Sequence, residues 1–161
     1  GSSRSKTCTP ERRRIGHWEI DTVLGAGSRD CILSLVERKT GYLLMGKLAT
    51  RTAAAFTERA TRLIRAQPRP VRTVTADNGT ELTGYRTIER RTGARFYFPR
   101  PYHAWERGTN ENTNGLIREY LPKRRSMVEL TQRDCTRIAR QLNQRPRKRL
   151  GYRTPEECYA T

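Results

Sequence analysis

The sequence is poor in acidic residues, in lysine and in long apolar runs. Aspartate and glutamate total 16 against 33 basic residues, which gives a net charge of +17. Lysine supplies only 5 of those basic residues and arginine 28. No apolar run approaches 18 residues, which excludes a transmembrane helix. The sequence also lacks the apolar region of a signal peptide.

Cysteines are few and scattered. The four cysteines form no C-x-x-C pair, and the two histidines, His17 and His103, lie far from them in the sequence. This spacing excludes the usual zinc sites. Single cysteines are typical of a reducing cytoplasm, where most of them serve as small core residues.

The excess of positive charge predicts a polyanionic partner, and nucleic acid is the usual one. An acidic membrane surface is the competing interpretation, but no amphipathic segment carries a large apolar face. A GC-rich genome would explain arginine in place of lysine. It would not explain the excess of basic over acidic residues.

The 161 residues are enough for one domain with a single core. The first three residues, GSS, resemble the remnant of a cleaved tag, so we expect a piece of a longer protein. Residues 1–14 are basic and lack periodicity, and we interpret them as an arm or linker. Residues 15–161 are the predicted folded domain.

The order of the predicted elements indicates an α/β fold. Three strand-like runs separated by turns come first, at residues 17–24, 31–37 and 42–48. Helical periodicity follows at 52–66, 82–91, 109–120 and 131–143, with short strands at 71–76 and 94–98. This order is that of the RNase H-like fold. It predicts a mixed five-stranded sheet, three strands antiparallel and two parallel, flanked by helices.

Three acidic residues occupy positions that favour a metal site. Asp21 lies inside the first strand, where a carboxylate is costly unless it is paired or bound to metal. Asp77 follows a buried strand, although Asp-Asn-Gly is also an ordinary turn. Glu111 lies in the first turn of a helix, where it could equally be a capping acid. Together, in a strongly basic chain, the three predict a metal site that faces DNA.

Neighbouring residues complete the candidate site. Asn114 and Arg118 lie three and seven residues after Glu111, on the same helix face. Glu19 shares a strand face with Asp21 and is either a second layer of the site or an outward-facing surface acid. Asn78 and Trp105 are further candidates, Trp105 for stacking on an unpaired base or for ordinary packing.

Four stretches resemble motifs of the IS30 family of bacterial insertion-sequence transposases. They are GHWEIDT at residues 16–22, TADNGTE at 75–81, WERGTNENTNGLIR at 105–118 and NQRPRKRLGYRTPEE at 143–157. Together they extend from residue 16 to residue 157. The second motif is weak and the third is specific. The 33 residues between Asp77 and Glu111 match the spacing of that family.

The resemblance implies a DDE transposase core with Asp21, Asp77 and Glu111 as the catalytic, metal-binding triad. It implies Mg²⁺ or Mn²⁺, two ions in our interpretation, and cleavage and strand transfer of double-stranded DNA at element ends and target. It also implies a dimer or higher assembly on DNA, although this piece could be monomeric alone, and a bacterial cytoplasmic protein on the nucleoid. Full-length members carry helix-turn-helix segments, which this sequence lacks.

Basic residues near the triad and in the C-terminal third are the predicted DNA contacts. The span 123–149 holds ten basic and two acidic residues, which favours a phosphate-binding face over ordinary solvated charge. The predicted contacts are Arg107, Arg118, Lys123, Arg124, Arg125, Arg145, Arg147, Lys148 and Arg149. Arg107 and Arg118, which flank Glu111, could equally be solvated charges of a helix.

Three other functions fit part of the pattern. A ribonuclease H would share the fold, but the motif around Glu111 disfavours it. A catalytically inert or domesticated DNA-binding module would share the charge, but the three acids are intact. A ribosomal or chromatin-like protein gives no reason for acids at these positions.

Overall fold

The computed structural model describes residues 15–25, 31–48, 50–76, 83–98, 108–122, 126–127 and 129–160. For residues 108–112 the description covers the backbone only. Five strands form one sheet in the order β3-β2-β1-β4-β5. In this part of the chain, no helix is long and apolar enough to cross a membrane.

The first three strands form an antiparallel meander, as predicted. β1 (His17–Leu24) pairs with β2 (Cys31–Glu37), and β2 pairs with β3 (Leu43–Leu48). β4 (Thr73–Thr75) adds to the other side of β1 in parallel, and β5 (Arg95–Tyr97) adds to β4, also in parallel. The predicted sheet of three antiparallel and two parallel strands is therefore confirmed.

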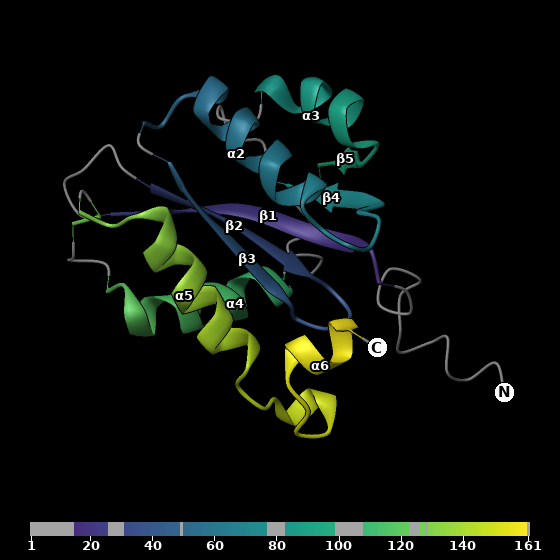
Figure 1. Ribbon diagram of the computed structural model, residues 1–161, viewed down its shortest axis with the longest axis vertical. Coiled ribbons are helices and arrows are strands. Elements are labelled where there is room, and N and C mark those ends of the chain that lie inside the picture. Colours follow the sequence, from purple (N-terminus) through teal and green to yellow (C-terminus); the bar gives the residue numbers. More distant parts are fainter. Residues whose placement is uncertain are drawn as a thin grey trace, which may run out of the picture.

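Helices cover both faces of the sheet (Figure 1). On one face, α2 (Ala53–Arg65) and α3 (Tyr85–Thr92) enclose a core. On the other face, α4 (Gly108–Tyr120) and α5 (Gln132–Asn143) enclose a second one. Alternate side chains of each strand point to opposite faces. Ile20 accordingly belongs to the first core and Val23 to the second.

The ends of the helices follow local sequence signals. Thr52 caps α2 by accepting a hydrogen bond from the Ala55 N–H. Gly93 ends α3 in a left-handed conformation that glycine adopts without strain. Thr131 and Asp134 form a capping box at the start of α5.

Two C-terminal elements were not predicted. They are the short 3₁₀ helix η4 (Lys148–Leu150) and α6 (Pro155–Ala160). Tyr159 of α6 is buried in the first core, where its ring stacks on Tyr42 at 4.3 Å and meets Trp18 edge-on at 5.8 Å. The end of the described chain is therefore part of the folded domain (Figure 1).

Candidate active site

Asp21 lies in the middle of β1, on the face that α4 covers. Its Oδ1 accepts a hydrogen bond from the Thr22 backbone N–H at 2.9 Å. Its Oδ2 accepts one from the side-chain amide of Asn114 in α4, also at 2.9 Å. The side chain is half-buried. Both carboxylate oxygens of Asp21 thus have defined partners, which fixes the orientation of the group.

Asn114 joins α4 to the sheet. Its amide nitrogen donates to Asp21, while its Oδ1 is buried and has no hydrogen-bond partner among the described residues. A buried amide oxygen without a partner is unfavourable. An amide carbonyl is also a hard oxygen ligand of the kind that Mg²⁺ accepts.

Glu19 is fully buried, with 0% of its surface exposed. Its Oε2 lies 3.6 Å from Nε of Arg38, which is itself buried. The alternative that Glu19 is an outward-facing surface acid is therefore wrong. Glu19, Asp21 and Val23 are two residues apart along β1, so their side chains share one face of the sheet, that of the second core.

Of the other two acids of the predicted triad, the structure describes the backbone of one and nothing of the other. Glu111 belongs to α4, but its side chain lies outside the described part of the chain. Asp77 lies outside the described residues altogether, as do Asn78, Trp105, Arg107, Lys123, Arg124 and Arg125. Within the described residues, no cluster of three or more metal-binding side chains occurs.

The predicted DNA contacts in the described part of the chain differ in their surroundings. Arg118 is half-buried, and its guanidinium donates to the carbonyl oxygens of Leu24 at 3.1 Å and Leu121 at 3.4 Å. Arg145 is also half-buried, since it bonds to Glu119 and to the Tyr120 hydroxyl. Arg118 therefore joins α4 to the end of β1, and Arg145 joins the segment after α5 to α4.

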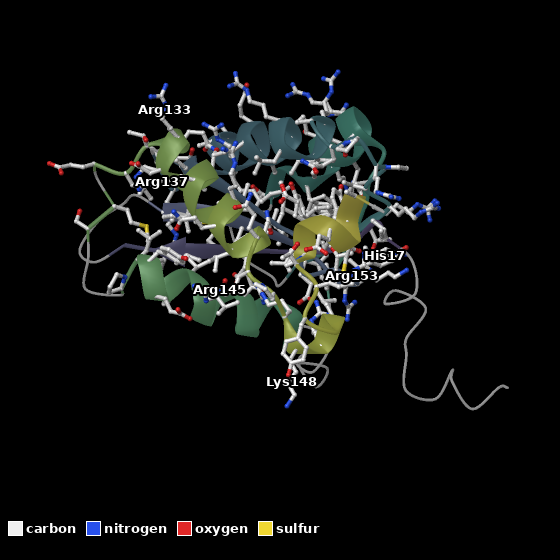
Figure 2. All side chains as sticks on the ribbon, turned by 60° about the horizontal axis from the view of Figure 1, so that its bottom comes forward. His17, Arg133, Arg137, Arg145, Lys148 and Arg153 are labelled. Atoms are coloured by element: carbon white, nitrogen blue, oxygen red, sulfur yellow. The ribbon has the colours of Figure 1, made fainter. Side chains whose placement is uncertain are left out.

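The remaining three lie near η4. Arg147 is half-buried, and burial above all, with Arg149 and Arg145 nearby, lowers its pKa. Arg149 is exposed and donates to the Lys39 carbonyl at 3.3 Å. Lys148 is exposed, and Figure 2 shows its side chain pointing away from the protein. The same view shows Arg133 and Arg137 on the outer side of α5.

Sequence comparison relates the chain to known transposases. It is 42% identical over 148 residues to the transposase for insertion sequence element IS4351 of Bacteroides fragilis. It is 40% identical over 147 residues to transposase InsI for insertion sequence element IS30A of Escherichia coli. The matches cover 92% and 91% of this chain but only 45% and 38% of those proteins. No protein-family model matches the chain.

Structural comparison gives the same fold. The model resembles the crystal structure of the catalytic core domain of BIV integrase with a TM-score of 0.67. The likeness covers 90% of this chain and 93% of that one at 20% sequence identity. This match confirms the predicted RNase H-like fold.

Proposed function

Because the chain belongs to the IS30 family of insertion-sequence transposases, we propose that it is the catalytic core of such an enzyme. In this proposal it cleaves DNA phosphodiester bonds at the ends of an insertion sequence and transfers the strands into target DNA. Residues 15–161 form that core and residues 1–14 an arm or linker. The observation that carries the proposal is the hydrogen bond between Asp21 and Asn114, which brings α4 against β1.

The strand register supports a meeting of Asp21 with Asp77. β1 and β4 are parallel, and Glu19 is the partner of Thr75. Two residues further along the chain from each partner are Asp21, still in β1, and position 77, which follows the end of β4 at Thr75. In a regular parallel pair, partners point to the same face. We therefore expect the Asp77 carboxylate on the same face as Asp21.

The helix register supports the addition of Glu111. Glu111 precedes Asn114 by three residues in α4, and residues three apart lie one above the other on a helix. Since Asn114 touches the Asp21 carboxylate, we expect the Glu111 side chain near the same point. Three acids, one in β1, one after β4 and one in α4, would then face a single site.

The residues present fit a divalent metal. Carboxylate oxygens are the ligands that Mg²⁺ and Mn²⁺ prefer, and the buried Asn114 Oδ1 is a further oxygen without a hydrogen bond among the described residues. Asp21, Asp77 and Glu111 would hold the metal, which we take to be two ions. When bound, such ions activate the attacking oxygen and stabilise the leaving oxygen of a phosphodiester.

The protein's own groups then have defined tasks. Thr22 and Asn114 fix the two oxygens of Asp21, and Arg118 holds α4 to the end of β1 through Leu24. The positive charge of the chain attracts the DNA backbone. Joining two element ends to a target favours a dimer or larger assembly on DNA, on the nucleoid of a bacterial cytoplasm.

The test is metal-dependent nicking of a supercoiled plasmid in Mn²⁺. Asp77→Asn and Glu111→Gln each remove one charge with little change of shape, so both variants should keep the wild-type melting temperature. We expect the wild type to nick the plasmid and both variants to fall to background. Equal nicking by wild type and variants would refute the triad. A wild type that binds DNA but neither cuts it nor binds Mn²⁺ would identify an inert DNA-binding module.

A further inference from the structure

The chain reverses direction between Arg147 and Arg153, in what we call the C-terminal hairpin (residues 147–153). An isolated antiparallel bridge joins its two ends, and the Arg147 N–H donates to the Arg153 carbonyl at 3.0 Å. The Arg153 N–H donates to Leu150 at 3.3 Å. This second bond closes a tight turn with Gly151 and Tyr152 at its centre, both with φ of 66°.

Tyr152 is an unusual residue for this turn. Positive φ at both central positions favours glycine, asparagine or aspartate, because a bulky L side chain is disfavoured there. Tyr152 is the one non-glycine residue with positive φ in the described part of the chain. Its side chain is 69% exposed, and no ring contact of it occurs within that part. Packing therefore does not offset the disfavoured backbone, and such a conformation suggests a binding role.

Positive charge surrounds the tyrosine. The hairpin contains Arg147, Lys148, Arg149 and Arg153 within seven residues. Arg153 lies 3.9 Å from Glu157 on an exposed surface, so one acid partly offsets this charge. Nε of Arg147 is buried and has no hydrogen-bond partner among the described residues. Lys148 follows Arg147 at the start of the hairpin, and its side chain points outward (Figure 2).

We propose that the C-terminal hairpin binds DNA strands at an unpaired base, with Tyr152 stacking on the base and the flanking cations holding the phosphates. An exposed aromatic ring among basic residues is the arrangement that single-stranded nucleic acid recognises. A second copy of this chain fits less well, because its charge of +17 would oppose the same cations. The proposal rests on the proposed function only for DNA as the class of partner.

The hairpin lies away from Asp21. Arg149 bonds to Lys39 in the turn between β2 and β3. In the same turn, the Arg38 N–H donates to the carbonyl of His17, the first residue of β1. Asp21 is four residues further along β1, roughly 13 Å at the rise of a strand. The hairpin would therefore hold a part of the DNA other than the part that lies at Asp21.

The test is the binding of fluorescein-labelled 12-nucleotide single strands and of the matching duplex, measured by anisotropy in EDTA. Without metal no strand is cut, so the result is independent of cleavage. We expect Tyr152→Gly to weaken single-strand binding by roughly 5- to 100-fold. Tyr152→Phe keeps the ring and should stay within about twofold of wild type. The salt dependence of binding should not change, because no charge is removed.

Glycine suits positive φ, so Tyr152→Gly should keep or raise the melting temperature. Tyr152→Asn is a second variant that tolerates this backbone and lacks the ring. Tyr97→Ala, at an exposed tyrosine on β5, is the matched control and should bind single strands like wild type. An unchanged affinity in Tyr152→Gly and Tyr152→Asn, or an equal loss on duplex and single strand, would overturn the proposal. So would self-association that Tyr152→Gly abolishes.

The two proposals can fail separately. If the triad variants still nick DNA while Tyr152→Gly loses single-strand binding, the proposed catalytic site fails and the hairpin proposal stands. If cleavage depends on the triad but Tyr152→Gly binds normally, the reverse holds.

Discussion

Asn114 donates a hydrogen bond from its side-chain amide to Oδ2 of Asp21 over 2.9 Å, which ties α4 to the middle of β1. Partners that orient a metal-binding carboxylate typically contribute 10- to 100-fold to affinity or activity. We therefore predict that Asn114→Ala lowers metal-dependent plasmid nicking by about 10- to 100-fold. The free energy of unfolding should fall by less than about 1.5 kcal/mol. The variant loses one hydrogen bond, but it also removes a buried oxygen that has no hydrogen-bond partner among the described residues.

The measurement is the initial nicking rate at several Mn²⁺ concentrations, with chemical denaturation for stability. Thr22 still holds Oδ1 in the variant, so some activity should remain. A wild-type rate in Asn114→Ala would show that this contact has no part in the reaction.

Gly115 gives a prediction about stability alone. It is exposed in the interior of α4, and a methyl group added there would meet no atom of the described residues within 4 Å. Glycine in a helix costs roughly 0.5–1 kcal/mol relative to alanine. Gly115→Ala should therefore raise the free energy of unfolding by about that amount. Urea denaturation measures it, and a lower midpoint would mean that another group occupies the space.

The edge strand β3 depends on Asn143 of α5. The buried Asn143 amide donates to the Leu43 carbonyl at 2.9 Å and accepts from the Leu43 N–H at 2.8 Å, as a neighbouring strand would. Asn143→Ala leaves both backbone groups buried without partners, so we predict a loss of about 2–4 kcal/mol in the free energy of unfolding. Denaturant titration provides the measurement.

Gln132 is the matched control, because it contacts the same strand nearer to solvent. It accepts from the Lys47 N–H and donates to the Met45 carbonyl. Water can replace it there, so Gln132→Ala should cost less than about 1.5 kcal/mol. Equal losses of unfolding free energy in the two variants would contradict the claim that Asn143 takes the place of a neighbouring strand at the edge of β3.

The raised pKa of Tyr159 predicts how the stability of the fold changes in strong alkali. Burial above all, together with Tyr42 and Glu37, raises the pKa of Tyr159 to about 12. An unfolded tyrosine has a pKa of about 10. The folded state therefore favours the protonated ring, and this stabilisation is complete below pH 10 and lost as the pH rises toward 12. Tyr159→Phe should lose less stability over that interval, as measured by denaturation at stepped pH. If the free energy of unfolding fell equally with pH in wild type and Tyr159→Phe, the raised pKa of Tyr159 would be contradicted.

Local patterns predicted most of the fold. The bounds of β1 and β2 match the prediction because their apolar runs end at clear turn signals. The predicted helix at 82–91 is the less accurate case, since α3 starts at Tyr85. The missed helix α6 did have a signal, because Thr154 and Glu157 form an S/T-x-x-E pattern with proline between them. Its short length concealed it.

The site was predictable only in part. The sequence predicted that Asn114 shares a helix face with Glu111, and the structure shows that Asn114 contacts Asp21. The role of Asn143 was not predictable, since its partner Leu43 is 100 residues away. The burial of Glu19 likewise depends on Arg38, which reaches it only when β1 and β2 pair. Contacts of this kind arise from the topology, and no local pattern encodes them.

The central claim is that Asp21, Asp77 and Glu111 form one metal site. Its most direct test is a Mn²⁺ titration followed by electron paramagnetic resonance, with wild type, Asp21→Asn, Asp77→Asn and Glu111→Gln. The account predicts that wild type binds Mn²⁺ and that each single substitution weakens binding by about tenfold or more. If all three variants bound Mn²⁺ as wild type does, the three acids would not share a site and the account would be contradicted.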